Sequence, residues 1–490
     1  MRVVSSQEGP VVVVGAGPGG YAAAMRCHDL GLATVLVESG GVGGAGLHRG
    51  ALSSKTWWHL ANDYAQAIRR DRGFRVTVEA PSFQHVAAEV EEAVLERRTI
   101  LEFQLEALHA QPGSGFRFLR GRASLVGDRL VSVQNTRGEV EVIAARAVIL
   151  ATGSKPRQPA AYPIDNVRIL TSDSLDDMRE FPGRLLIIGA GVVGCEYATI
   201  YSRFGRTQVD LVDRQPRILP FEDEDVSAHV TESFSNIGIR VHAGAHVESL
   251  RVVGDEVEAT LHIGGGERVV RADRCLVAAG RVACTQNLGL ESLGISLEPS
   301  GALAVDGTRV RGTSWLHAVG DLSADIALAN VAELEGRHAA EFIAGLDPSP
   351  IPYAAISSIY FLHPEVVAVG LGERAAIEQR ISVRVAVLSN RLVHRNVAMR
   401  STGGFLKLIS SPDGRLLGLR AVGPQVSSAA QGIALLIDRA GTVRDLARCI
   451  HPHPAVPEGL QECARLLLGE SQHKPQVFGP EFLSVRTHTF

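Results

Sequence analysis

Two glycine-rich turns combine the residue types and the spacing needed to bind the pyrophosphate of a dinucleotide. They lie at 15–20 and 189–194, and each follows a short apolar run. Glycines in this pattern let backbone N–H groups approach a pyrophosphate at the positive N-terminus of the following helix. The sequence therefore predicts two dinucleotide sites, whose turn residues are Gly15, Gly17, Pro18 and Gly20 in the first and Gly189, Gly191 and Gly194 in the second.

Each turn lies within a complete strand–turn–helix–strand unit. The first unit has apolar runs typical of strands at 11–14 and 34–37, with a helix-forming stretch between them. The second repeats the order, with strands expected at 185–188 and 209–212. This order predicts an α/β fold with two Rossmann-like dinucleotide-binding domains.

An acidic residue follows the second strand of each unit. Glu38 and Asp213 stand where a carboxylate accepts a hydrogen bond from a ribose 2′-hydroxyl. Asp213 favours NADH over NADPH, because a carboxylate repels a 2′-phosphate. Arg214 and Arg217 leave the alternative open, since either side chain is able to pair with that phosphate or to remain a solvated surface charge.

Composition narrows the class of protein. The chain has 490 residues and a formal net charge of −4, which predicts several globular domains and no nucleic-acid partner. No apolar run reaches the roughly eighteen residues of a membrane span, and no export signal is apparent, so a cytoplasmic location is expected. The cysteines are scattered, without the spacing of a metal site or a disulfide framework, and no bound metal is expected.

The segment 43–55 resembles the redox-active helix of the flavoprotein disulfide reductases, the family of dihydrolipoamide dehydrogenase, glutathione reductase and mercuric reductase. The shared frame is Gly43, Gly44, Gly50, Ser54 and Lys55. Gly46 and Ala51 occupy the positions of the two cysteines of that family. Neither residue can form a thiolate or a mixed disulfide, so we expect this chain to lack the disulfide relay and to leave room there for a substrate beside the flavin.

The resemblance implies that the first dinucleotide is FAD and the second is NAD(P)H, with NADH favoured by Asp213. The segment 313–321 resembles the element whose aspartate holds the flavin ribityl chain, and a helix expected at 327–340 would face the flavin with its positive end. Besides the two turns and the two acids, the resemblance assigns to the cofactor sites Gly44, Lys55, Ala151, Thr152, Gly153, Gly280, Arg281, Gly320, Asp321 and Ala329.

Two acid–base pairs are implied as catalytic by the same resemblance. Lys55 is expected beside the reactive flavin nitrogen, paired with Glu196, where it stabilises negative charge on the flavin. His453, in a His-Pro sequence, is expected to serve as a general acid/base oriented by Glu458. In the family this histidine acts in the active site of the partner subunit, so the resemblance implies a homodimer with shared active sites.

The resemblance also divides the chain into domains. We expect an FAD-binding domain at 1–155 and 275–349, an NAD(P)-binding domain at 156–274, an α+β dimerisation domain at 350–468 and a C-terminal tail at 469–490.

The predicted function is that of an FAD-dependent oxidoreductase in which NAD(P)H reduces FAD and the flavin passes electrons directly to a quinone or similar small acceptor. Soluble transhydrogenase activity is an alternative, although His453 counts against it, because that enzyme has tyrosine there. A dihydrolipoamide dehydrogenase homologue without disulfide chemistry and a non-catalytic FAD-binding partner protein are further alternatives. Retention of both acid–base pairs favours catalysis.

Overall fold

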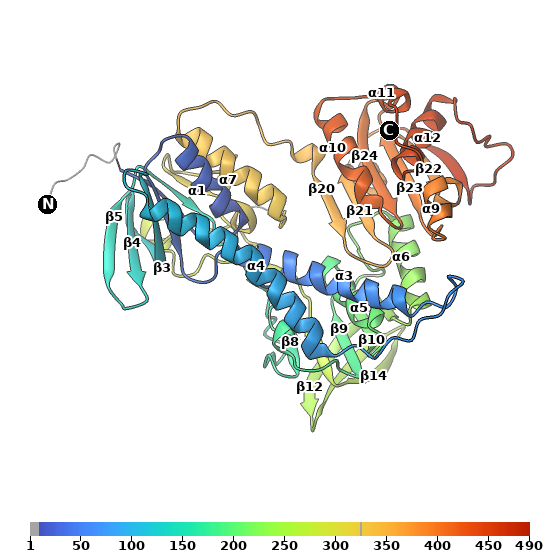
Figure 1. Ribbon diagram of the computed structural model, residues 1–490, viewed down its shortest axis with the longest axis horizontal. Coiled ribbons are helices and arrows are strands. Elements are labelled where there is room, and N and C mark those ends of the chain that lie inside the picture. Colours follow the sequence, from blue (N-terminus) through green and yellow to red (C-terminus); the bar gives the residue numbers. More distant parts are fainter. Residues whose placement is uncertain (1–8, 324–325) are drawn as a thin grey trace.

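The computed structural model describes residues 9–323 and 326–490, which form three domains around a common centre (Figure 1). The first domain contains a nine-stranded sheet in the order β17-β18-β19-β6-β1-β2-β3-β4-β5. Its strands are β1 (Val11–Val14), β2 (Thr34–Glu38), β3 (Phe116–Gly127), β4 (Leu130–Asn135), β5 (Val140–Ala144), β6 (Ala147–Leu150), β17 (Val305–Asp306), β18 (Arg309–Val310) and β19 (Leu316–Ala318). Its helices are α1 (Pro18–Asp29), α2 (Gly44–Leu47), α3 (Ala51–Ala67), α4 (Phe83–Ala110) and α7 (Ala329–Ile343).

The second domain repeats the same plan around a five-stranded parallel sheet in the order β11-β10-β9-β15-β8. These strands are β8 (Ile169–Thr171), β9 (Arg184–Ile188), β10 (Gln208–Asp213), β11 (Arg240–Ala243) and β15 (Arg274–Val277), with helices α5 (Val192–Arg203) and α6 (Glu224–Asn236). A hairpin sheet of β12 (His246–Val253), β13 (Glu256–Ile263) and β14 (Gly266–Ala272) packs beside it. A two-stranded ladder of β7 (Ser154–Pro156) and β16 (Arg281–Ala283) joins the first two domains.

One boundary differs from the expectation. Because β15 hydrogen-bonds to both β8 and β9, the second sheet continues to Val277, past the domain end expected at 274.

The third domain contains a six-stranded sheet in the order β20-β21-β24-β23-β22-β25. The strands are β20 (Ser357–Tyr360), β21 (Val366–Gly370), β22 (Val383–Ser389), β23 (Phe405–Ser410), β24 (Leu416–Val422) and β25 (Leu483–His488). The helices are α8 (Glu373–Glu378), α9 (His394–Ala398), α10 (Ala430–Asp438), α11 (Val443–Arg448) and α12 (Pro457–Leu468). The segment 469–490, expected to be a tail, instead supplies the edge strand β25, which pairs antiparallel with β22.

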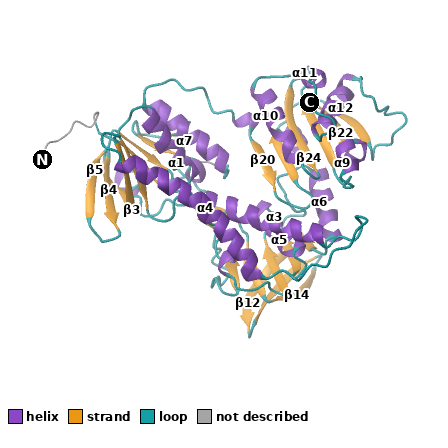
Figure 2. Ribbon diagram, viewed as in Figure 1, coloured by secondary structure: helices purple, strands orange, loops and turns teal. Residues whose placement is uncertain are grey.

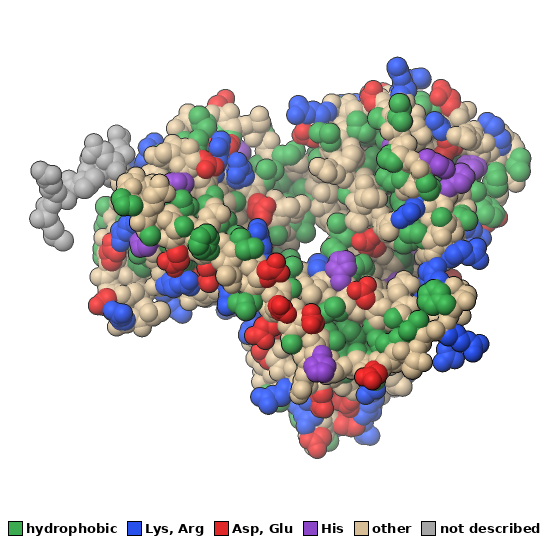
Figure 3. Space-filling model, in the orientation of Figure 1, with side chains coloured by type: hydrophobic (Ala, Val, Ile, Leu, Met, Phe, Trp, Pro, Cys, Tyr) green, Lys and Arg blue, Asp and Glu red, His purple; other side chains and the backbone are tan. Residues whose placement is uncertain are grey.

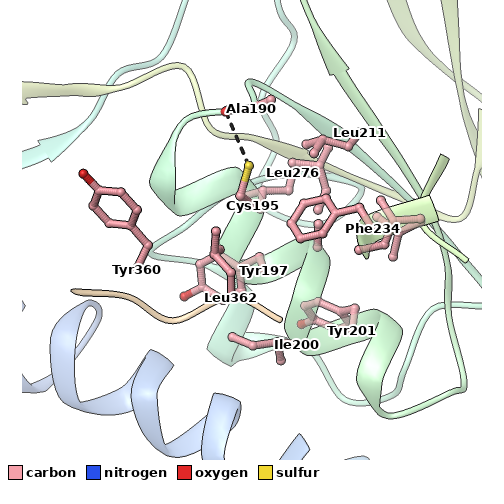
Figure 4. Close-up of a cluster of buried hydrophobic side chains, with 14 of the residues drawn as sticks. Ala190, Cys195, Tyr197, Ile200, Tyr201, Leu211, Phe234, Leu276, Tyr360 and Leu362 are labelled. Carbon is pink, nitrogen blue, oxygen red and sulfur yellow. Dashed lines mark hydrogen bonds between the residues drawn. The ribbon is translucent and has the colours of Figure 1, made fainter. Parts of the chain in front are cut away.

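The three domains share a hydrophobic core built around α5. Every residue from Gly194 to Tyr201 on this helix is buried. Figure 4 shows Tyr360 and Leu362, which come from the third domain, beside Tyr197 and Cys195 of α5. Trp57 of α3 belongs to the same buried cluster, and Figure 2 shows α3 running alongside α5. This shared core fixes the domains around one central region.

Within the described residues, no helix combines the length and the apolar character that a bilayer crossing requires.

Helices α1 and α7 approach so closely that only glycine fits at their contact. A Cβ atom at Gly336 would lie 2.1 Å from the carbonyl oxygen of Gly19. A Cβ atom at Gly20 would lie 1.8 Å from the carbonyl oxygen of Gly15, which closes the first glycine turn. Because the obstructing atoms are backbone atoms, the structure has little freedom to relax around an added methyl group.

We expect Gly336→Ala to lower the free energy of unfolding by about 1–3 kcal/mol, because the added methyl group overpacks the contact between α1 and α7. The matched control is Gly432→Ala on α10, where a Cβ atom meets nothing within 4 Å. That control is expected to raise stability by about 0.5–1 kcal/mol, since alanine restricts the unfolded chain. Chemical denaturation measures both, and equal stability of the two variants would contradict the close contact.

Candidate active site

A cavity of about 760 Å³ lies where the domains meet. Figure 3 shows the surface hollowed between the first and third domains. Most of the predicted cofactor residues line this cavity, together with Glu196: Gly15, Gly17, Pro18, Glu38, Gly44, Lys55, Ala151, Thr152, Gly153, Gly191, Gly280, Arg281, Gly320, Asp321 and Ala329. The remaining predicted residues, which do not line it, are Gly20, Gly189, Gly194, Asp213, His453 and Glu458.

The two glycine turns have the same geometry and fit a pyrophosphate. Gly17 and Gly191 precede α1 and α5, and a Cβ atom at either position would meet nothing within 4 Å. Gly20 and Gly194 lie beneath the turns, where a Cβ atom would be 1.8 Å from the carbonyl oxygen of Gly15 or Gly189. The outer glycines therefore leave space at the helix N-termini, and the inner glycines allow the turns to close, as a bound pyrophosphate requires.

The carboxylates of Glu38 and Asp213 are fixed beside their turns by backbone amides. Glu38 accepts hydrogen bonds from the amide of Ala16 at 2.6 Å and of Gly40 at 2.6 Å. Asp213 accepts from the amide of Ala190 at 2.6 Å and of Gln215 at 2.8 Å. Each carboxylate oxygen has a second lone pair for a ribose hydroxyl.

Arg217 is already engaged within the protein. Its guanidinium pairs with Glu224 at 3.0 Å and donates to the carbonyl oxygens of Pro220 and Glu222. Arg214 is exposed beside Asp213. Arg217 is therefore held at the start of α6 by these three contacts.

The segment that resembles the redox helix is packed tightly against the first glycine turn. Gly46 and Ala51 both line the cavity, and no cysteine of the described chain does. A Cβ atom at Gly46 would lie 2.6 Å from Cγ of Pro18, closer than van der Waals contact allows. A side chain at this position would therefore collide with the Pro18 ring, and the glycine lets α2 pack against the first turn.

Lys55 and Glu196 form an ion pair between α3 and α5, with 2.9 Å between Nζ and Oε2. The side chain of Glu196 is 7% exposed and that of Lys55 is 27% exposed. The other carboxylate oxygen of Glu196 accepts a hydrogen bond from the amide of Phe361 at 3.0 Å. The Lys55 ammonium also lies 5.0 Å from the centroid of the Phe361 ring. Phe361 has no sequence signal for this role, since 165 residues separate it from Glu196.

Asp321 belongs to a polar network at the junction between the first two domains. Its Oδ2 accepts a hydrogen bond from the hydroxyl of Ser154 at 2.5 Å. Arg281 donates to the same hydroxyl at 2.7 Å and to the Ser154 carbonyl at 2.8 Å. Ser154, which the sequence did not identify, therefore joins the two predicted residues. Ala329 begins α7 at the cavity edge, so the positive end of this helix faces the cavity.

His453 and Glu458 form a second pair, with 2.6 Å between Nδ1 and Oε1. The other oxygen of Glu458 accepts from the amide of Ala455 at 2.7 Å. Burial tends to raise the pKa of Glu458, but the Ala455 amide and His453 outweigh that effect and lower it. The carboxylate holds the His453 imidazole, whose side chain is 63% exposed. The ring of His394, 5.2 Å away between centroids, faces this pair and had no sequence signal.

Comparison with known proteins agrees with this architecture. Residues 9–336 match the family model of pyridine nucleotide-disulphide oxidoreductases, and residues 356–464 match the dimerisation domain of the same family. The chain is 34% identical to a dihydrolipoyl dehydrogenase of Chlamydia muridarum over 95% of its length and 98% of that protein. It is 32% identical to a dihydrolipoyl dehydrogenase of Geobacillus stearothermophilus over 95% of its length and 97% of that protein.

Among solved structures, the crystal structure of LpdA from Mycobacterium tuberculosis superposes with a TM-score of 0.86 at 27% sequence identity. The alignment covers 94% of this chain and 99% of that one. Members of the matched family use FAD and a nicotinamide dinucleotide, and the two glycine turns described above fit both groups. The chain therefore belongs to the pyridine nucleotide-disulphide oxidoreductases and is an FAD-dependent, dihydrolipoamide dehydrogenase-like enzyme.

Proposed function

We propose that this enzyme is an NAD(P)H dehydrogenase in which FAD passes electrons directly to a quinone or a similar small acceptor. The observation that carries the proposal is the cavity wall at α2 and α3, where Gly46 and Ala51 stand and no described cysteine is present. Without a thiol at this wall, the chain supplies no redox group between the flavin and its acceptor. An acceptor that reacts with the flavin itself satisfies this constraint.

FAD supplies the hydride-accepting and electron-donating chemistry when it is bound. The contribution of the chain is electrostatic. Lys55 is oriented by the buried carboxylate of Glu196, and its ammonium is at the cavity wall. The N-terminus of α7 at Ala329 adds a second positive end at the same cavity. Both favour negative charge within the cavity, which supports a role in flavin reduction.

Proton transfer is assigned to His453 in the same proposal. A quinone takes up protons as well as electrons, and an imidazole held by a carboxylate is suited to supply one. Because His453 is exposed and does not line the cavity of its own chain, its active-site role requires a second copy. The dimerisation domain at 356–464 carries this histidine, which supports a homodimer with shared active sites.

NADH is the proposed coenzyme. The carboxylate of Asp213 is fixed beside the second turn, and Arg217 is held by Glu224 and by two backbone carbonyls. A 2′-phosphate would therefore meet a carboxylate without the compensation of Arg217. This geometry supports discrimination against NADPH.

We also propose that the protein is located in the cytoplasm. All six cysteines are unpaired. Burial raises the pKa of Cys27 to about 12, so that this thiol is neutral and inert. Unpaired thiols are typical of proteins from reducing compartments.

The proposal predicts turnover with a quinone alone. In anaerobic assays of the flavin-loaded protein with NADH, a water-soluble benzoquinone is expected to be reduced. Lipoamide is not, because no dithiol relay is present, and thio-NAD is not, because the proposed acceptor is a quinone and not a second nicotinamide. Reduction of thio-NAD would instead identify a transhydrogenase. If neither NADH nor NADPH bleached the flavin absorbance, both interpretations would be wrong.

His453→Ala is expected to lower quinone-dependent turnover by about 10²–10⁴-fold, the usual contribution of a general acid. The rate of flavin reduction by NADH in a single turnover should stay unchanged, since that step needs no proton from His453. The matched control is His451→Ala, two residues upstream, whose ring lies 3.5 Å from the carbonyl oxygen of Leu446. An equal loss in both variants would contradict the assignment.

Coenzyme choice gives another test. We expect kcat/KM for flavin reduction to be at least about tenfold higher with NADH than with NADPH, a difference of about 1.4 kcal/mol. Arg217→Ala should leave this ratio unchanged, because the guanidinium is occupied by Glu224 and backbone carbonyls. A selective loss of NADPH use in that variant would show that Arg217 binds the phosphate.

A further inference from the structure

A buried cluster of charges joins the second domain to the third. At its centre is Lys407 of β23, whose side chain is 0% exposed. Its ammonium lies 2.7 Å from Asp223 and 2.5 Å from Asp225, which stand at the start of α6. It also lies 3.3 Å from Glu373, the first residue of α8. One lysine thus faces three carboxylates contributed by two domains.

The C-terminal strand supplies the second cation of this cluster. Arg486 of β25 contacts Glu373 at 2.7 Å and Asp225 at 3.1 Å. His488, two residues further along the same face of the strand, contacts Glu373 at 2.9 Å. The match to the family's dimerisation domain ends at residue 464, so these side chains come from a segment beyond it. With Arg486 present, three carboxylates face two permanently charged cations.

The cluster continues without interruption to the wall of the active-site cavity. Glu222, next to Asp223, accepts a hydrogen bond from the guanidinium of Arg420 at 2.7 Å. Its other oxygen accepts from the hydroxyl of Tyr360 at 2.7 Å. Tyr360 lines the cavity, and the amide of its neighbour Phe361 binds Glu196. Tyr360, the last residue of β20, and Phe361, the residue after it, are therefore held by Glu222 beside the charged cluster and by Glu196, the partner of Lys55.

We propose that Arg486 is a positioning residue for flavin reduction by NADH: through the Lys407 cluster it holds the cavity wall at 357–361, and with it Glu196. The proposal rests on the first half of the proposed reaction and is independent of the acceptor. Removal of Arg486 leaves the three carboxylates, of which Asp225 is 30% exposed, with Lys407 and His488 as their contacts, and the excess negative charge pushes the start of α6 away from β23. That displacement reaches Tyr360 through Glu222.

The test compares Arg486→Gln with wild type in the full-length, flavin-loaded protein. Hydrogen–deuterium exchange of the amides at 357–361 is expected to become faster. The apparent Kd of NADH, taken from single-turnover flavin reduction in the absence of oxygen and quinone, is expected to rise about 2–30-fold, the range found for mutations that act along such a network. Thr487→Ala is the matched control, because Thr487 is exposed on the other face of the same strand.

A double variant separates charge balance from a general loss of stability. Arg486→Gln combined with Glu373→Gln restores the excess of one carboxylate found in wild type and is expected to recover at least half of the change in Kd. If Arg486→Gln lowers thermal stability but leaves both the exchange at 357–361 and the Kd of NADH unchanged, the proposal is wrong. The exchange measurement needs no coenzyme, so it tests the positioning role even in a protein that fails to oxidise NADH.

Discussion

The carboxylate of Glu196 is the constraint on which the arrangement of the three domains depends. One oxygen pairs with Lys55 on α3 of the first domain, and the other accepts the amide of Phe361 in the third domain. Glu196 itself belongs to α5, the most deeply buried helix of the second domain. A buried carboxylate is costly unless it is paired and hydrogen-bonded, so all three domains must keep their places for this charge to be satisfied. The same pair faces the cavity, which links the assembly of the domains to the electrostatics of the site.

The polar contacts around the cavity are formed although no cysteine of the described residues lines it. Gly46 and Ala51 stand at the cavity wall, and Gly46 packs against Pro18 of the first glycine turn. The pair on α3 and α5, the Asp321 network and the His453–Glu458 pair are all formed. The absence of a described cysteine at the cavity wall is the basis for the proposed direct transfer of electrons from the flavin to a small acceptor.

Buried charge also orders the junction between the second and third domains. Lys407 lies on β23, an interior strand of the third domain's sheet, and its side chain has no contact with solvent. Its carboxylate partners come from the start of α6 and from α8. Such a cluster specifies one relative placement of two domains, because each charge is satisfied only in that placement. Strand β25 adds Arg486 and His488 to it from the last residues of the chain. The C-terminal segment is thus part of the domain interface.

The sequence by itself determined the two glycine units, their strands and their terminal acids. These features depend on local spacing and on positions that only glycine can occupy. It also identified Lys55, Glu196, His453 and Glu458, although their roles came from a family resemblance. Tertiary structure alone decided that Pro18 fills the space beside Gly46, that Ser154 joins Arg281 to Asp321, and that Phe361 holds Glu196. These contacts join residues that are far apart in the sequence, and β25 is placed only by its pairing with a strand about a hundred residues earlier. Local patterns in a sequence indicate which helices and strands form, whereas packing between distant elements decides which side chains come into contact.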